Sequence, residues 1–254
     1  LHPKIHAGIL HDRQNKKHKN EMSKQNFPAI DLIIVNFYPF QKIVLNSKNS
    51  KNIVENIDIG GPTMVRAAAK NFNNVTIITN KRDYNSLIKE LDQNKGKTTL
   101  KFRELMSSKA FSLTAYYDAM IANWFNKKLK IDFPERKTIF GRKIRKLRYG
   151  ENPHQQGSIY VSDYDDKKLG FSQIHGKELS YNNYSDIFAS LEILKSLKKN
   201  SGTVVIKHEN PCGVSENKNP LISFKNAYAS DPTSAFGGVI ACNYKINNKI
   251  AYEI

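Results

Sequence analysis

Two short apolar runs in the first half of the chain, residues 31–36 and 75–79, have the length of buried strands. The first run is continuously apolar rather than alternating, which is typical of a parallel strand that is covered on both faces, and the second predicts another strand. Between them, residues 64–70 contain three consecutive alanines and predict a helix, and residues 83–91 and 100–127 predict two more. Strands that alternate with helices indicate an α/β domain.

Three polar segments give weaker signals. Residues 12–28 have no apolar period and predict a loop or a poorly anchored helix, and residues 41–57 predict a partly helical stretch. Residues 128–147 are basic, contain Pro134 and Gly141, and have no clean period. We therefore expect a linker in this last segment.

A second group of elements follows the expected linker. Apolar runs at 158–161, 203–208 and 238–242 predict strands, and residues 186–199 and 221–229 predict helices. The pattern indicates a second α/β unit. The expected organisation is a domain at 1–130, a linker at 131–146 and a second domain at 147–254.

The chain is strongly basic. It has 254 residues and carries 40 Lys and Arg against 23 Asp and Glu, a formal net charge of +17. Such a charge favours contact with phosphates or nucleic acid. However, the lysines are scattered along the whole chain, and no nucleic-acid-binding motif accompanies them. The lysine codon bias of an AT-rich genome is therefore the favoured explanation, and a nucleic-acid surface is the alternative.

Other features of the composition favour a cytoplasmic protein. Two cysteines do not make a disulfide framework, and a reducing compartment is expected. The sequence has neither a long uncharged apolar run nor a signal-peptide pattern, so neither a membrane span nor secretion is predicted. Because the chain begins with Leu1 rather than Met, we expect it to be an internal fragment.

Lys207 and His208 are the leading candidates for catalysis. They lie at the carboxyl end of the predicted strand 203–208, where ligands bind in open α/β sheets. A His in this position can act as a general base near neutral pH, and the adjacent Lys can stabilise developing negative charge. Residues 210–213 (NPCG) are expected to turn the chain after them. Two ordinary polar residues at a strand end are the plain alternative, which the attached turn makes less favourable.

A zinc deaminase site is rejected. That site needs His-x-Glu and Pro-Cys-x-x-Cys, whereas Glu209 follows His208 directly and Ser215 stands three residues after Cys212. Cys212 is instead expected to be a small buried residue at a turn. No P-loop, GxGxxG or GxSxG motif occurs, so ATP-binding, dinucleotide-binding and serine-hydrolase functions lack support.

Two further segments are candidates for binding. Arg148 offers a planar fork that suits phosphate, and Tyr149 a ring that can stack on a base or an imidazole. Asp58 precedes a predicted helix start whose backbone amides could hold a substrate oxygen. Lys70 lies on the order of 12 Å further along that helix, so the sequence does not show that it shares a pocket with Asp58. A solvated lysine at a helix end is the alternative for Lys70.

Two loops at strand ends complete the set of candidates. Asn36 and Tyr38 follow the first predicted strand, and a capped strand end is the alternative for them. Residues 231–238 (DPTSAFGG) form a glycine-bearing loop before a predicted strand, which suits close approach of the backbone to a ligand.

Taken together, these segments resemble the bifunctional purine biosynthesis family of AICAR formyltransferase/IMP cyclohydrolases, where AICAR is phosphoribosylaminoimidazolecarboxamide. The resemblance runs from Leu1 to about Cys242 and is weakest at 12–28 and 128–145. Seven motifs occur in the order and approximate spacing of the family: LHPKIHAGIL, DLIIVNFYPF, VENIDIGGPTMVRAAAKN, LRYGENPHQ, GKELSYNNYSD, VVIKHENPCGV and DPTSAFGGVIA.

The resemblance implies two reactions. The C-terminal part of the family transfers a formyl group from 10-formyltetrahydrofolate to AICAR, and the N-terminal domain closes formyl-AICAR to IMP with loss of water. The implied fold is a partial methylglyoxal-synthase-like parallel-sheet domain, followed by the first part of a cytidine-deaminase-like α/β transformylase domain. No metal is expected for catalysis, and a homodimer is expected for the full-length protein.

The resemblance also implies roles for individual residues. Lys70 matches the cyclohydrolase catalytic lysine, His208 the transferase proton acceptor, and Lys207 the residue that steadies its transition state. Tyr38 and Asp58 are placed with the catalytic residues. The implied substrate contacts are Asn36, Ile59, Arg148, Tyr149, Asn183 and Gly237.

The resemblance covers only part of the length of the family's proteins. The family's first domain begins well before the position of Leu1, and its second continues well past that of Ile254. We therefore expect no detectable formyl transfer by this chain alone. The rival hypothesis is a basic, non-catalytic nucleic-acid-binding protein.

Overall fold

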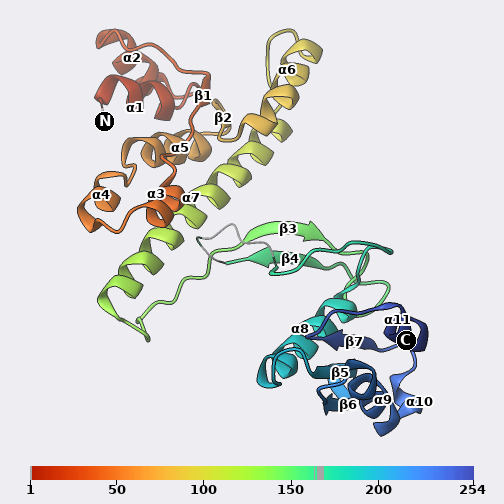
Figure 1. Cartoon of the computed structure of the whole chain (residues 1–254). Coiled ribbons are helices and arrows are strands. Elements are labelled where there is room, and N and C mark those ends of the chain that lie inside the picture. The colour runs from red at the N-terminus through yellow and green to blue at the C-terminus, as the bar shows by residue number, and fades with distance from the viewer. Residues whose placement is uncertain (1, 163, 165–168) are drawn as a thin grey trace. The chain divides into compact units, whose positions relative to one another are not determined.

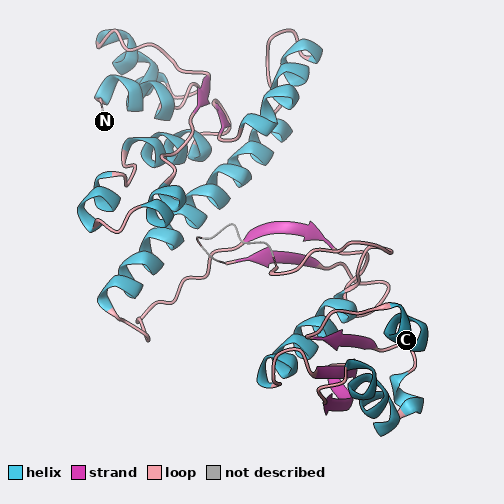
Figure 2. Cartoon of the chain, in the orientation of Figure 1, coloured by secondary structure: helices cyan, strands magenta, loops and turns pink. Residues whose placement is uncertain are grey.

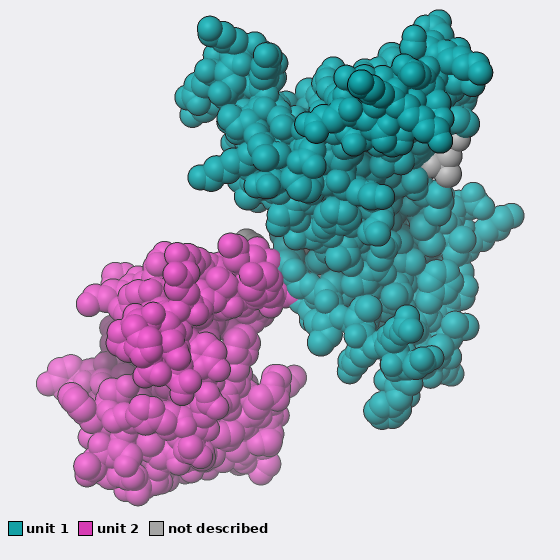
Figure 3. Space-filling view, turned by 180° about the vertical axis from the view of Figure 1, so that it is seen from behind, with its two compact units in different colours: residues 1–142, 162–167 teal, residues 143–161, 168–254 magenta. Residues whose placement is uncertain are grey.

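The chain forms two compact units, which Figure 3 distinguishes by colour. A computed structural model describes residues 2–162, 164 and 169–254. The first unit comprises Leu1–Arg142 with Ser162–Lys167, and the second comprises Lys143–Val161 with Lys168–Ile254. The predicted functional domains, 1–130 and 147–254, stay predictions, because compactness does not identify an activity.

The first unit packs helices against a small parallel sheet (Figures 1 and 2). Its elements are α1 (Pro3–Leu10), α2 (Lys16–Lys24), β1 (Leu32–Ile34), α3 (Phe40–Asn46), α4 (Ser50–Glu55), α5 (Gly60–Lys70), β2 (Thr76–Ile78), the 3₁₀ turn η1 (Lys81–Asp83), α6 (Tyr84–Gln93) and α7 (Leu100–Leu129). Strands β1 and β2 pair in parallel, with Ile33 opposite Ile77. The predicted α/β class is therefore confirmed.

One prediction about β1 is wrong. Its run was expected to be buried on both faces, but Leu32 and Ile34 are 37% and 49% exposed. Side chains alternate between the two faces of a strand. Ile33 therefore packs into the core with Val65 and Ile77, whereas the described residues leave the opposite face of β1 open to solvent.

The weakly patterned segment 12–28 contains α2, so the helix alternative is the correct one. Asn15 caps this helix by accepting hydrogen bonds from the backbone amides of Lys17 and His18. Met22, which is 9% exposed, anchors it. A single buried apolar residue gives no period, which explains the weak signal.

The second unit is α/β with antiparallel sheets. Its elements are β3 (Arg142–Lys146), β4 (Ser158–Val161), α8 (Tyr181–Ser196), β5 (Gly202–Lys207), β6 (Asn210–Glu216), α9 (Pro220–Ser230), α10 (Pro232–Ala235), β7 (Val239–Cys242) and α11 (Asn248–Glu253). Strand β5, which is buried except at Lys207, lies between β6 and β7 and pairs antiparallel with both. Strands β3 and β4 form a separate two-stranded sheet.

Residues 142–146, which lie in the segment expected to be a linker, form strand β3. In this strand only Ile144 is partly buried, and the four basic residues around it are exposed. A strand with so little burial on either face lacks the apolar alternation by which strands are recognised in a sequence.

Strand β6 passes so close to α9 that residue 213 must be a glycine. A Cβ atom on Gly213 would lie 1.8 Å from the carbonyl oxygen of Ala227. The backbone cannot move to make room for this atom unless β6 separates from α9. At Gly60, the first residue of α5, a Cβ atom would meet nothing within 4 Å.

We predict that Gly213→Ala lowers the free energy of unfolding by about 3 kcal/mol, the upper range for overpacking. Chemical denaturation followed by far-UV circular dichroism measures this change. Gly60→Ala is the matched control and should be neutral or slightly stabilising, because alanine favours a helix. Equal effects of the two substitutions would contradict the packing argument.

Candidate functional site

The candidate catalytic pair lies at a tight hairpin between β5 and β6. Lys207 is the last residue of β5 and pairs with Asn210, so His208 and Glu209 alone form the turn. Their φ angles are +53° and +64°, as a two-residue turn of type I′ requires. The predicted turn at 210–213 is therefore wrong, because these residues belong to β6.

A turn with two such residues is strained. Left-handed backbone costs roughly 1–2 kcal/mol for a residue that is not glycine. A partner on another element holds this turn: Oδ1 of Asp186, in α8, accepts a hydrogen bond of 2.8 Å from the backbone amide of Glu209. Within the turn, the side-chain amide of Asn210 donates to the carbonyl oxygen of His208 at 2.9 Å.

Asp186 was not among the residues predicted from the sequence. It is only 9% exposed, although it carries a carboxylate. Ser190 and Leu194, also buried, follow it at intervals of four residues and therefore lie on the same face of α8. A carboxylate in line with the buried face of an amphipathic helix is a signal that the sequence does contain.

The loop before β7 lies beside the candidate pair. Nζ of Lys207 donates a hydrogen bond of 2.9 Å to the carbonyl oxygen of Phe236. Gly237 follows with a φ angle of +77°, and a Cβ atom on Gly238 would lie 2.6 Å from the carbonyl oxygen of Ile206. The structure thus brings Lys207, His208 and Gly237 together.

A second cluster surrounds the N-terminus of α8. The guanidinium carbon of Arg148 lies 4.8 Å from the ring centroid of Tyr149, and Nη2 donates to the Tyr149 hydroxyl at 3.1 Å. Hydrogen bonds from Arg148, first, and from Ser180 lower the pKa of Tyr149 below its ordinary value. Ser180 also forms a reciprocal capping box with Asn183.

The two clusters share one helix. Asn183 and Asp186 are three residues apart in α8, about 4.5 Å along its axis. The first turns of α8 therefore connect the Arg148–Tyr149 loop to the turn that carries His208. In this unit the predicted residues are spread over four segments of the sequence, and one helix links them.

Cys212 differs from its prediction. It lies within β6 rather than at a turn, and it is half-buried rather than buried. In the part of the chain that the structure describes, no group of three or more His, Cys, Asp or Glu side chains is placed to hold a metal ion. Nor does any helix in the described ranges have the length and apolarity to cross a membrane.

In the first unit, the Asp58 carboxylate joins two segments. Its Oδ1 accepts a hydrogen bond of 2.8 Å from the amide of Gly61 at the start of α5, and its Oδ2 accepts one of 3.3 Å from the amide of Tyr38. The Tyr117 hydroxyl, from α7, accepts a bond of 2.9 Å from the amide of Asp58. Burial is the main cause that raises the pKa of Tyr117. The structure therefore places Asp58 and Tyr38, both predicted site residues, in direct contact.

The other predicted residues of the first unit are more dispersed. Asn36 and Ile59 are exposed, the latter by 64%. Lys70 is the last residue of α5, and an 11-residue helix is about 16 Å long. Asp58 is bound at the other end of that helix. Lys70 is exposed, and its side chain has no hydrogen bond or ion pair with the residues that the structure describes.

Comparison with known proteins supplies the family. The model of the AICARFT/IMPCHase bienzyme family matches residues 68–254. The chain belongs to this family. Its relatives include the bifunctional purine biosynthesis protein PurH of Bradyrhizobium diazoefficiens, which is 46% identical over 259 residues and matches all of this chain. The PurH proteins of Persephonella marina and Oceanobacillus iheyensis are 43% and 42% identical and match 97% and 100% of the chain.

The chain spans about half the length of these relatives, 48% of the first two and 50% of the third. Among solved structures, the crystal structure of ForH is 31% identical, with a TM-score of 0.42. The match covers 48% of this chain and 63% of that one. The family model and the PurH relatives confirm, at the level of the family, the resemblance noted from the seven motifs.

We predict that the hydrogen bond from Glu209 to Asp186 protects the Glu209 amide from exchange with solvent. Asp186→Ala should accelerate hydrogen exchange at Glu209 at least tenfold, because the amide loses its acceptor. Asp186→Asn should restore most of the protection, because a side-chain carbonyl remains. Exchange measured by NMR tests this, with the amide of Val204 inside β5 as the internal control. Unchanged exchange at Glu209 in Asp186→Ala would exclude the role of Asp186.

We also predict that the pKa of Tyr149 rises when Arg148 is replaced by Gln. A hydrogen bond and positive charge favour the phenolate, so the folded wild-type chain should form the phenolate at a lower pH than the variant. A titration of the Tyr149 Cζ resonance by NMR measures the difference. Lys146→Gln removes an exposed charge nearby and serves as the control. Overlapping curves for Arg148→Gln and wild type would contradict the assignment.

Proposed function

We propose that this chain contributes residues to the last two steps of IMP synthesis. The second unit would take part in formyl transfer from 10-formyltetrahydrofolate to AICAR, and the first in closure of formyl-AICAR to IMP with loss of water. The observation that carries the proposal is the turn beside Asp186, which presents His208 next to Lys207. Membership of the bienzyme family supports it.

In the proposed transfer, the amine nitrogen of AICAR attacks the formyl carbon. A carbon–nitrogen bond forms there, and the bond from the formyl carbon to the folate nitrogen breaks. The amine loses a proton, and the departing folate nitrogen gains one. The amine is a weak nucleophile, because the imidazole ring delocalises its lone pair. His208 is the proposed base that takes the proton, and the Lys207 ammonium offsets the negative charge that develops on the formyl oxygen.

The surroundings of the pair suit both substrates. Arg148 is exposed and has guanidinium N–H groups that can bind the phosphate of AICAR. Tyr149 lies against Arg148 and is linked to Asn183 through Ser180. Phe236 is 85% exposed, and its carbonyl oxygen accepts from Lys207. An exposed aromatic ring in this place suits stacking of the flat folate ring system. In this proposal the positive charge comes from Lys207, and no metal is required.

For the ring closure, Asp58 would fix the loop at Tyr38 and the start of α5. Asn36 and Ile59, both exposed beside these residues in the sequence, would contact the ring of the nucleotide. Lys70, the proposed catalytic lysine, is at the far end of α5 from Asp58. A homodimer, in which Lys70 serves a pocket completed by a second subunit, would account for this separation.

The finer fold assignment is also a proposal. The parallel pairing of β1 with β2 supports a methylglyoxal-synthase-like first domain, and the second would be cytidine-deaminase-like. The proposed location is the cytoplasm. The proposed partners are AICAR, formyl-AICAR and IMP, with no specific nucleic acid.

We predict saturable AICAR binding to the chain at physiological salt, weakened at least tenfold by His208→Ala or Arg148→Ala. Each substitution removes a group that contacts the substrate in the proposal. Isothermal titration calorimetry measures the Kd. Lys146→Ala, which removes an exposed charge from β3, should leave the Kd within twofold of wild type. A parallel titration with single-stranded RNA tests the rival function. Salt-sensitive RNA binding without saturable AICAR binding would reject the enzyme proposal.

A further inference from the structure

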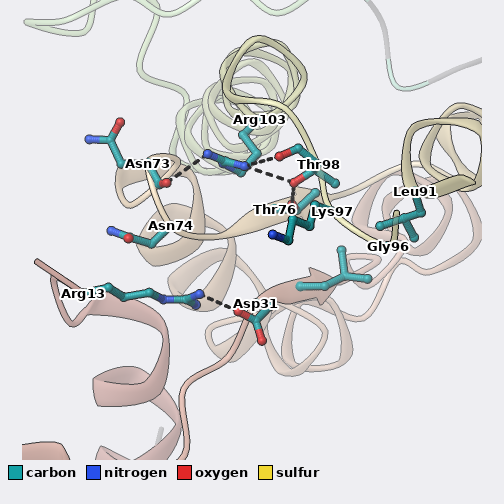
Figure 4. Close-up of a pocket in the computed structure, with 11 residues that line it drawn as sticks. Arg13, Asp31, Asn73, Asn74, Thr76, Leu91, Gly96, Lys97, Thr98 and Arg103 are labelled. Atoms are coloured by element: carbon teal, nitrogen blue, oxygen red, sulfur yellow. Dashed lines mark hydrogen bonds and ion pairs between the residues drawn. The ribbon is translucent and has the colours of Figure 1, made fainter. Parts of the chain in front are cut away.

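A cavity of about 580 Å³ lies in the first unit, away from the residues discussed above (Figure 4). It is at the amino ends of the parallel strands, where Asp31 precedes β1 and Thr76 begins β2. Asn36 and Tyr38 follow the carboxyl end of β1. The cavity and the proposed nucleotide site of this unit are therefore at opposite ends of the strands.

The wall of this cavity is predominantly basic. Arg13, Lys97 and Arg103 line it together with a single carboxylate, that of Asp31. The lining therefore carries a formal net charge of +2. The remaining side chains that line the cavity are uncharged. A cavity of this charge and size suits a small anionic ligand.

Arg103 is the fixed part of the wall. Its guanidinium donates to the carbonyl oxygens of Phe72, Asn73 and Thr98, which belong to the two loops beside the cavity. The Thr98 hydroxyl also bonds to that of Thr76 at 2.8 Å. Figure 4 shows this set along one side of the cavity and the Arg13–Asp31 pair along the other. The loops are thus held in place before any ligand arrives.

Arg13 and Lys97 have hydrogen-bonding capacity left. Arg13 pairs with Asp31, whose side chain is 77% exposed, and donates to the carbonyl oxygen of Ile30 at 2.9 Å. Its Nε is buried, and among the described residues it has no partner. A buried donor without an acceptor costs free energy. Lys97 is exposed, and its side-chain ammonium group has no hydrogen bond or ion pair with the residues that the structure describes.

We propose that this cavity binds the phosphate group of a small phosphorylated ligand. The planar fork of Arg13 matches two phosphate oxygens, and Lys97 adds a mobile point charge. The net charge of +2 on the cavity lining balances a phosphate dianion. The cavity has room for the organic part of a phosphate monoester as well as the phosphate itself. The proposal is independent of the function proposed for His208 and Arg148.

Inorganic phosphate is the probe, titrated into the 254-residue chain at low ionic strength by calorimetry. We expect saturable binding, weakened at least tenfold by Arg13→Gln and at least threefold by Lys97→Gln. Arg13→Lys should give an intermediate loss, because the charge stays and the fork is removed. Lys101→Gln removes an exposed charge outside the cavity and should change the affinity by less than twofold. Circular dichroism checks that each variant is folded.

Two further experiments test the location of this site and the class of its ligand. Lys199→Gln removes an exposed charge from the second unit and should leave the phosphate binding intact. Succinate should bind more weakly than phosphate, and stronger succinate binding would overturn the proposed ligand class. An equal effect of Arg13→Gln and Lys101→Gln, or no saturable binding by the folded wild-type chain, would overturn the site itself.

Discussion

The position of His208 depends on a turn that its own residues do not favour. His208 and Glu209 both have left-handed backbone, with φ angles of +53° and +64°. In hairpins, these two positions usually hold Asn and Gly, which adopt this conformation at little cost. Here the cost is roughly 1–2 kcal/mol for each residue. The buried carboxylate of Asp186 offsets part of it by accepting a hydrogen bond from Glu209.

This arrangement suits a residue that must be held in one place. A turn closed by glycine would tolerate several conformations, because glycine has few steric limits. A turn of two larger residues has fewer alternatives once an acceptor on another element fixes it. The strain and the hydrogen bond to Asp186 therefore both restrict the backbone position from which the His208 side chain extends. Local strain of this kind is often found at functional sites, where the surrounding fold determines the conformation.

In the second unit, the sequence predicted the strands and helices better than the turns that connect them. The apolar run at 203–208 matches β5, which is fully buried except at Lys207. The turn was misplaced because Pro211 and Gly213 are typical turn residues. Pro211 is tolerated in β6 because this is an edge strand, and the pairing shifts register beside it. Gly213 is explained instead by the contact with Ala227. Local composition cannot distinguish these causes.

Most candidate site residues were predicted from motifs, but their contacts were not. The sequence indicated Lys207 and His208 as a pair, yet the acceptor that fixes their turn lies more than 20 residues earlier, in α8. The link from Arg148 and Tyr149 to Asn183 also depends on a tertiary contact, through Ser180. Such contacts between distant segments leave no pattern within a short window, so that only the folded chain reveals them.

The two units differ in how far their own residues assemble a site. In the second, α8 links both clusters, because Asn183 and Asp186 are one turn apart. In the first, α5 keeps its candidates separate: Asp58 binds the N-terminal end, and Lys70 is the last residue at the other. A rigid helix cannot bring its two ends together. The homodimer proposed above, in which Lys70 of one copy serves a pocket at Asp58 of another, would bring the two residues to one substrate.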